Sequence, residues 1–210
     1  MPGKKPINRA STVGLDVGLA HFVTLSDGSK IDNPRHLFAA LARLKRGQRT
    51  LCRRRRKGQL PSKNYQNQRL KVARLHERVA NRRADFLHKV STTIVKAWDT
   101  VAMENLNISG MVKNHRLARS ISDVGWGAFK TMVRYKCEWQ GKNFCEIGRF
   151  EPTSKQCSSC GHKREKLALS VRTWSCAACG SEHDRDVNAA VNIANLVAGQ
   201  PVAAGIVVTV

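Results

Sequence analysis

The chain has 210 residues, with 37 lysines and arginines against 15 aspartates and glutamates, so its formal net charge is +22. A hydrophobic content of 41% in a chain of this length excludes wholesale disorder and allows a substantial core. The charge favours a polyanionic partner, nucleic acid before an anionic membrane. No apolar run approaches the roughly 18 residues of a spanning helix, and residues 1–11 lack the apolar segment of a signal peptide. We therefore expect a cytoplasmic, reducing setting, no membrane association and no disulfide framework.

Short strands are predicted near the N-terminus. Residues 1–10 are basic, contain two prolines and are expected to form a loose arm. Residues 12–19 form a β-rich run, and residues 21–25 form a second one. A turn of Ser, Asp and Gly follows, after which residues 30–31 are expected to begin a third strand. Together these segments predict an antiparallel meander.

A basic helical hairpin is predicted over residues 34–98. Apolar residues at helical spacing indicate one helix over 35–57 and a second over 66–98, separated by a break that contains Gly and Pro. Residues 43–83 hold 16 lysines and arginines and a single glutamate, a net charge of +15. We expect this ridge to contact nucleic-acid phosphates, although a charge run can also be only a solvated face. The residues expected to bind are Arg53, Arg54, Arg55, Arg56, Lys57, Lys71, Arg74 and Arg78.

The second half of the chain alternates between strands and helices, which predicts an α/β fold. In chain order we expect a buried strand over 99–104, a polar loop over 105–119, a helix over 122–140, a strand over 143–147 and a short helix over 186–197. Residues 198–210 are apolar and punctuated by Gly and Pro, and either a terminal strand or a frayed tail fits them.

Four cysteines have the spacing of a zinc site. Two Cys-x2-Cys pairs are separated by 15 residues, and each pair can direct two thiolates at one centre. Four thiolates complete a tetrahedron and leave no open position, so the expected Zn²⁺ is structural. An iron–sulfur site or four unrelated buried cysteines are the alternatives, and His162 or His183 could replace a ligand. The predicted zinc ligands are Cys157, Cys160, Cys176 and Cys179.

Carboxylates are scarce, and several occupy unusual positions. Asp16 lies inside one apolar strand, Glu104 ends another, and Asp184 and Asp186 stand where the cysteine segment meets the last helix. A carboxylate in an apolar strand is costly to leave charged without a partner or a metal. If the fold gathers three of them, they could bind Mg²⁺ or Mn²⁺ and support two-metal phosphodiester hydrolysis. Taken singly, each is more often a solvated edge or a cap, and their separation along the chain leaves open whether they meet.

The motifs in combination carry a family resemblance. The run Gly-Leu-Asp-Val-Gly at 14–18 is followed by Met-Glu-Asn-Leu at 103–106, the two cysteine pairs, and Asp-Arg-Asp-Val-Asn-Ala-Ala at 184–190. In this order they resemble the TnpB/OrfB family, which bacterial and archaeal insertion sequences encode and which is related to compact type V CRISPR effector nucleases. The resemblance covers roughly residues 11–197.

The resemblance implies an RNase H-like (RuvC) nuclease core over residues 11–153 and 184–197, with a mixed sheet and a zinc ribbon inserted at 154–183. Family members cut DNA under the guidance of an RNA transcribed from the end of the element. Asp184 is the alternative for the third catalytic position. Matched motif by motif, the catalytic, magnesium-binding carboxylates are Asp16, Glu104 and Asp186.

One departure keeps a second function open. Family members carry a large N-terminal region that helps to bind guide RNA and to recognise a short DNA motif, whereas about 15 residues precede Asp16 here. The expected partners are DNA and guide RNA, and no oligomeric state is predicted. The alternative is a truncated remnant, either a non-catalytic zinc-ribbon protein that binds DNA or RNA or a regulator of transposition. The carboxylates discriminate between these functions, because a protein that only binds needs no buried acids facing phosphates.

Overall fold

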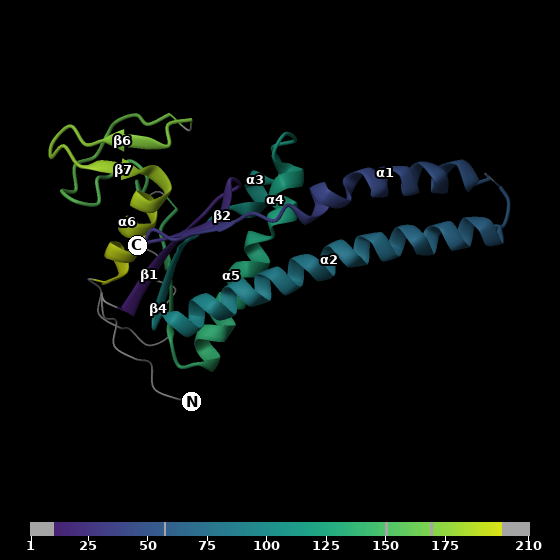
Figure 1. Ribbon diagram of the computed structural model, residues 1–210, viewed down its shortest axis with the longest axis horizontal. Helices are drawn as coiled ribbons and strands as arrows, with labels where there is room; N and C mark the ends of the chain where they lie inside the picture. Colours follow the sequence, from purple (N-terminus) through teal and green to yellow (C-terminus); the bar gives the residue numbers. More distant parts are fainter. Residues whose placement is uncertain (1–10, 57, 150, 169, 199–210) are drawn as a thin grey trace.

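A computed structural model describes residues 11–198 except 57, 150 and 169 (Figure 1). The expected arm at residues 1–10, Lys57 of the basic ridge and the tail from residue 199 lie outside the described residues. Within the described part, no helix has both the length and the apolar character needed to cross a membrane.

A five-stranded mixed sheet forms the centre of the fold, in the order β3-β2-β1-β4-β5. The predicted meander is confirmed, because β1, β2 and β3 pair antiparallel. β4 runs parallel to β1, with Leu15 opposite Met103, and β5 runs parallel to β4. The strands are β1 (Thr12–Val17), β2 (His21–Leu25), β3 (Lys30–Asp32), β4 (Thr100–Glu104) and β5 (Asn143–Ile147).

Helices cover both faces of this sheet (Figure 1). Alternate residues of a strand point to opposite faces. Leu15 and Met103 accordingly join the main core, where Phe22 and Phe129 meet edge to face at 4.8 Å, together with residues of α2 (Lys63–Ala97) and α5 (Trp126–Trp139). The opposite face carries a smaller apolar cluster with α6 (Arg185–Ala198). The strands are therefore enclosed between α2 and α5 on one side and α6 on the other.

The backbones of α6 and β1 are in close contact at Gly14. A Cβ built on Gly14 would lie 2.0 Å from the carbonyl oxygen of Ala190 and 2.6 Å from the amide nitrogen of Ala194. No side chain fits between these atoms, so glycine on the strand and alanines on the helix are what allow the contact. This packing places the first turn of α6 beside the end of β1.

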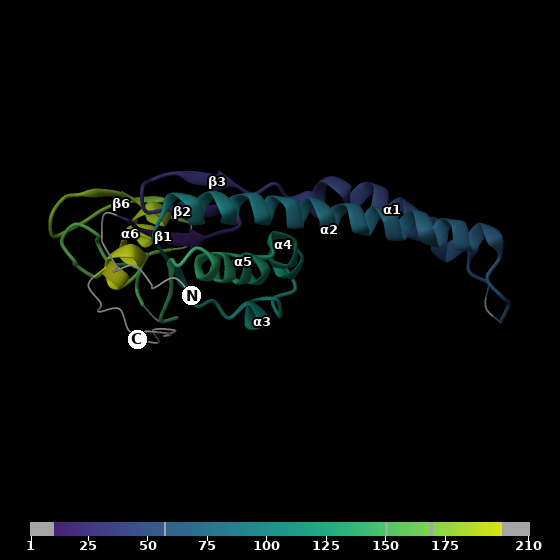
Figure 2. The same ribbon diagram turned by 90° about the horizontal axis from the view of Figure 1, so that it is seen from below.

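The two helices predicted for residues 34–98 are α1 (His36–Arg54) and α2, which has 35 residues. They pack through buried Leu44, Val72 and Val79, and Gly47 lets α1 approach Val72 closely. Ser62 caps α2 by accepting a hydrogen bond from the amide of Tyr65. Figures 1 and 2 show that the hairpin extends well beyond the sheet, with its turn at the far end.

The segment between β4 and β5 differs from its prediction. The polar loop expected over 105–119 contains the short helix α3 (Ile108–Met111), and the single helix expected over 122–140 is divided into α4 (Ala118–Val124) and α5. Gly125 separates them with a φ of 74°, a left-handed conformation that ends a helix and favours glycine. Two short paired strands, β6 (Thr173–Ser175) and β7 (Glu182–Asp184), lie in the cysteine segment.

Candidate functional site

Asp16 and Glu104 lie near the carboxyl-terminal ends of two neighbouring strands. β1 and β4 are parallel neighbours paired at Leu15 and Met103, and the next residue of each strand is the acid. Both acids fall on the face that carries α6, because Gly14, two residues before Asp16, contacts that helix. Asp186 occupies the first turn of the same helix. The fold thus brings the three predicted carboxylates to one end of one sheet face.

The pKa of Asp16 reflects the proximity of the other two acids. Burial raises its pKa well above the usual value, and the carboxylates of Glu104 and Asp186 raise it further, while Arg185 opposes them. Burial also raises the pKa of Glu104, against a hydrogen bond from a threonine hydroxyl. Glu104 and Asp186 therefore each lie close enough to Asp16 to oppose its charge, which is the condition that a bound divalent cation relieves.

Asp184 is engaged in other contacts. Its Oδ1 accepts the amides of Asp186 and Val187 at 3.0 and 3.1 Å and so caps α6, and its Oδ2 accepts Lys30 Nζ at 2.6 Å. Burial opposes its charged form, but the hydrogen bond from Lys30 and the two amides outweigh burial and hold its pKa below the usual range. Asp186 makes a looser ion pair with Arg172 at 3.5 Å.

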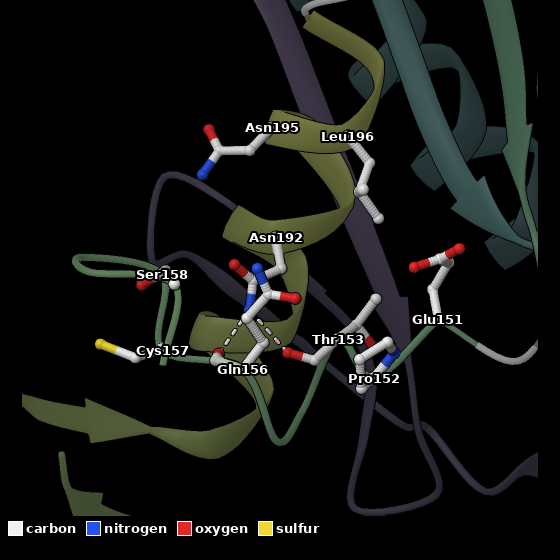
Figure 3. A pocket seen from close by; sticks show the side chains of 10 residues that line it. Glu151, Pro152, Thr153, Gln156, Cys157, Ser158, Asn192, Asn195 and Leu196 are labelled. Atoms are coloured by element: carbon white, nitrogen blue, oxygen red, sulfur yellow. Dashed lines mark hydrogen bonds between the residues drawn. The ribbon is translucent and has the colours of Figure 1, made fainter. Parts of the chain in front are cut away.

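A buried polar network that the sequence reasoning missed lies behind Glu104. Thr153 Oγ1 donates to Glu104 Oε1 at 2.6 Å. The side-chain amides of Asn188 and Asn192 each donate to the carbonyls of Thr153 and Gln156, over 2.7–3.2 Å. Figure 3 shows the two bonds of Asn192. Two asparagines one turn apart on the apolar face of the predicted helix were the available signal, because buried amides require partners.

A pocket of about 180 Å³ opens beside this network, between α6 and the segment that leads to the first cysteine (Figure 3). It is lined by Glu151, Pro152, Thr153, Gln156, Cys157, Ser158, Gly161, Asn192, Asn195 and Leu196.

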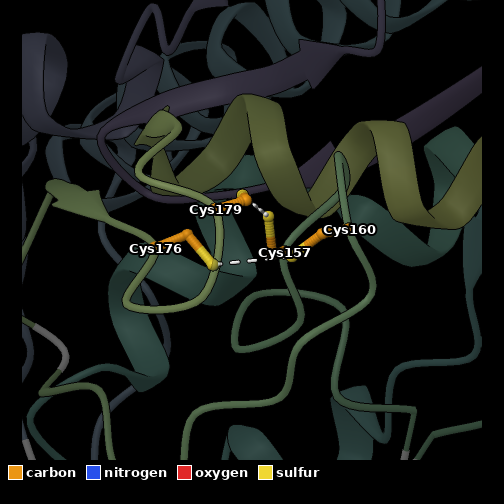
Figure 4. A group of neighbouring side chains, drawn as sticks. All are labelled: Cys157, Cys160, Cys176 and Cys179. Atoms are coloured by element: carbon orange, nitrogen blue, oxygen red, sulfur yellow. Dashed lines mark hydrogen bonds between the residues drawn. The ribbon is translucent and has the colours of Figure 1, made fainter.

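The four predicted cysteines converge (Figure 4), and their Sγ atoms all lie within 4.8 Å of one another. Two of these distances are 3.7 Å, from Cys157 to Cys179, and 3.6 Å, from Cys160 to Cys176. A tetrahedron with Zn–S bonds of about 2.3 Å separates its sulfurs by about 3.8 Å, so the cluster fits a zinc ion. Over residues 11–198 with the three gaps named above, it is the one group of three or more such ligands this tightly gathered; the three carboxylates do not approach one another as closely.

The two histidines near the cysteines differ in their surroundings. His183 is half-buried and contacts Trp174 with its ring tilted, at 4.8 Å between ring centroids, and its Nε2 lies 3.0 Å from Cys157 Sγ. It therefore contacts the outside of the thiolate cluster, as residues that orient metal ligands do. His162 is exposed.

The basic residues of the hairpin face solvent. Arg53 and Arg54 end α1, and Arg55 and Arg56 follow in the turn. Arg54 Nη1 donates to the carbonyl of Asn64, which ties the two helices together near the tip. The described members of the predicted set that are exposed are Arg53, Arg54, Arg55, Arg56, Lys71, Arg74 and Arg78. A surface of this charge suits a phosphate backbone.

Comparison with known proteins assigns the family. Residues 2–115 match the family OrfB_IS605, described as "Probable transposase", and residues 126–193 match "Cas12f1-like, TNB domain". The chain belongs to the TnpB/OrfB family. Both matches agree with the motif order from which the resemblance was drawn.

Relatives of this TnpB-family chain are longer than it is. It is 48% identical over 183 residues to a Streptomyces pristinaespiralis protein provisionally named an RNA-guided DNA endonuclease, covering 87% of this chain and 44% of that one. It is 36% identical over 210 residues to InsQ of Escherichia coli K12, provisionally given the same name, covering 93% and 50%. The chain therefore spans about half the length of these relatives.

A solved structure has the same fold. The cryo-EM structure of a CRISPR-Cas12f ternary complex superposes with a TM-score of 0.62 at 22% identity, over 92% of this chain and 40% of that one. The TnpB-family chain thus has a Cas12f-like fold built on a mixed α/β sheet.

Proposed function

We propose that this TnpB-family chain is a divalent-metal-dependent DNA endonuclease core that hydrolyses phosphodiester bonds. The observation that carries the proposal is the convergence of Asp16, Glu104 and Asp186 at one end of one sheet face, where the other two acids raise the pKa of Asp16. Because Asp184 is occupied by its capping hydrogen bonds and Lys30, we assign Asp186 as the third carboxylate.

The proposed core is RNase H-like, of the RuvC type. The strand order β3-β2-β1-β4-β5, with three antiparallel strands followed by two parallel ones, supports this assignment. The core comprises residues 11–153 and 184–197, and residues 154–183 form an inserted zinc ribbon. The separate small apolar cluster of Cys157, Trp174 and Cys176 supports that division.

The proposed chemistry follows from the oxygens that the three acids present. Mg²⁺ or Mn²⁺ bound there would activate a water and stabilise the leaving oxygen. The role of the chain is to hold three negative charges at the end of a rigid sheet, so that divalent cations relieve their repulsion. Thr153 restrains Glu104 through its hydroxyl, and the cap formed by Asp184 holds the turn that carries Asp186.

The proposed substrate is DNA and the proposed guide is RNA. The names of the relatives and the exposed cations of the hairpin support both partners. The arginines at the hairpin tip would bind phosphate at a distance from the carboxylates.

The test incubates the purified chain with labelled single-stranded DNA and Mg²⁺ or Mn²⁺, beside the variants Asp16→Ala, Glu104→Ala and Asp186→Ala. Asp85→Ala, which removes an exposed acid of the hairpin, is the matched control. We expect each of the three variants to abolish cleavage while DNA binding is kept or slightly strengthened, and the control to cleave normally. A wild-type chain that binds DNA but cleaves with neither metal would favour the binding-module alternative.

A further inference from the structure

We propose that Thr153 is a positioning residue that fixes Glu104 for metal binding and links it to the zinc ribbon. The inference rests on the proposed function, because it treats Glu104 as a ligand of the catalytic cation. The feature that suggests it is a short segment, residues 153–158, which contacts Glu104 at one end and contains the first zinc-site cysteine near the other.

Thr153 contacts Glu104 through a direct hydrogen bond from a buried side chain. Thr153 is 5% exposed, and its hydroxyl lies 2.6 Å from Oε1 of Glu104. A hydrogen bond to one carboxylate oxygen restrains rotation of the group and leaves the other oxygen available to a cation. Glu104 is the last residue of β4, so its side chain needs support from outside the strand.

Hydrogen bonds from two asparagines of α6 hold the backbone of Thr153 in place. Asn188 and Asn192 are 2% and 6% exposed, and their amides make four hydrogen bonds to the carbonyls of Thr153 and Gln156. Buried amides hold their partners firmly, because an unpaired one is costly. The helix that carries Asp186 therefore also sets the backbone position of Thr153.

The segment then enters the metal centre. Cys157 follows Gln156, and the amide of Ser158 donates to Asn188 Oδ1 at 2.9 Å. The side chain of Asn188 thus bonds the segment on both sides of the cysteine. Order imposed on Cys157 by a zinc ion would pass through this segment to Thr153 and on to Glu104, so that the ribbon contributes to the geometry of the carboxylates.

The decisive variant is Thr153→Val, which keeps the shape of the side chain and removes the hydroxyl. Residues that orient metal ligands typically contribute 10–100-fold to metal affinity. We therefore expect Thr153→Val to bind Mn²⁺ about 10-fold more weakly or worse, and Thr153→Ser, which retains the hydroxyl, to bind near the wild-type level. Asn192→Ala should weaken binding in the same direction, because it removes two of the four restraints on the segment.

The measurement is titration of the zinc-loaded 210-residue chain with Mn²⁺, by calorimetry or by the electron paramagnetic resonance signal of free Mn²⁺. Thr131→Val is the matched control, since that exposed hydroxyl bonds only the helix carbonyl of Gly127 among the described contacts. Zinc content and thermal unfolding are measured alongside, so that a loss of fold or of zinc is recognised. If Thr153→Val fails to fold, the comparison passes to Thr153→Ser and Asn192→Ala.

Three outcomes would overturn the inference. Wild-type Mn²⁺ affinity in a folded Thr153→Val would do so, and so would an equal loss in Thr153→Ser, which would assign the effect to packing of the methyl group. Wild-type affinity in Asn192→Ala would remove the link to α6. A wild-type chain whose Mn²⁺ binding is unchanged by Asp16→Ala would instead defeat the proposed function itself.

Discussion

Arg83 of α2 and Asp123 of α4 form a two-point contact at the base of the hairpin. Arg83 Nη2 lies 2.9 Å from Asp123 Oδ1, and Arg83 Nε donates to the carbonyl of Asp123 at 2.7 Å. The same carboxylate accepts the backbone amide of Leu37 at 3.0 and 3.1 Å, in the first turn of α1. The residue that precedes α1, Arg35, provides no side-chain cap, so Asp123 caps that helix from outside. One carboxylate thus joins both helices of the hairpin to the core.

Asp123→Ala should therefore loosen the hairpin. It removes the carboxylate partner of Arg83, whose side chain is 27% exposed and keeps its bond to the carbonyl of residue 123, and it removes the cap of α1. We expect a loss of about 2 kcal/mol in stability. Chemical denaturation measures the loss, and hydrogen exchange should locate it at the start of α1. Asp85→Ala, which removes an exposed pair with Lys89, should cost under about 0.5 kcal/mol. Equal effects of the two variants would contradict the assignment.

Asp16→Asn should stabilise the metal-free chain. Burial and the neighbouring acids raise the pKa of Asp16, so its charge opposes folding at neutral pH. A gain of 1 kcal/mol would raise Tm by roughly 2–4 °C in a domain of this size. Added Mg²⁺ should then raise the Tm of the wild type more than that of the variant. A wild type that is as stable as Asp16→Asn without metal would argue against a strained carboxylate cluster.

The same substitution carries a pH dependence with a defined sign. A carboxyl whose pKa is raised by folding favours the folded state most below its unfolded value, near 3.9, and that contribution is lost as pH rises through the folded value. The advantage of Asp16→Asn over the wild type should therefore be largest at neutral pH and shrink as pH falls. Paired thermal melts across this range test the trend, and an advantage that grows on acidification would contradict it.

Zinc should be present at one ion per chain. Because small metal modules take most of their folding energy from the ion, chelation or Cys176→Ser should increase hydrogen exchange across residues 154–183. Cys52→Ser, at an exposed cysteine of α1, should change neither zinc content nor exchange. Elemental analysis of protein purified without chelator checks the stoichiometry, and zinc-free protein would count against the site.

Phosphate contacts from the hairpin tip should make nucleic-acid affinity steeply salt-dependent. On single strands, the log–log slope against salt is about −0.7 for each neutralised phosphate. Glutamine at Arg53, Arg54, Arg55 and Arg56 together should flatten the slope, whereas lysine at the same four positions should preserve it. Fluorescence anisotropy at several salt concentrations measures both variants. An unchanged slope in the glutamine variant would mark the run as a solvated face.

Much of the fold could be predicted because its signals are local. Short apolar, β-rich runs predicted β1, β4 and β5, the helical spacing predicted α1 and α2, and the spacing of the cysteines predicted the metal cluster. The carboxylates could be proposed because an acid in an apolar strand is expensive, and the family resemblance then predicted which acids act together.

The remainder depended on contacts between distant segments. The break at Gly125 was missed because the apolar pattern continues across it, while a Cβ there would lie 3.2 Å from Cδ of Arg83. The family resemblance already favoured Asp186 over Asp184, but the bond from Lys30 to Asp184, 154 residues apart, could not be predicted from the sequence. The support of Glu104 by Thr153 joins two segments whose spacing in the sequence carries no periodicity.

The length of α2 would set the distance along a nucleic acid between its contact with the hairpin tip and its cleavage at the carboxylates. A helix of 35 residues measures about 50 Å. The N-terminal end of α2 lies at the hairpin turn, beside the tip arginines at the end of α1, and its C-terminal end leads into β4. The helix would therefore fix a spacing. A nucleic acid bound at the tip would reach the carboxylates only after more than one turn of B-form duplex, which measures about 34 Å. Deleting whole helical turns from both arms of the hairpin would then move the cut toward the gripped end by a corresponding number of nucleotides.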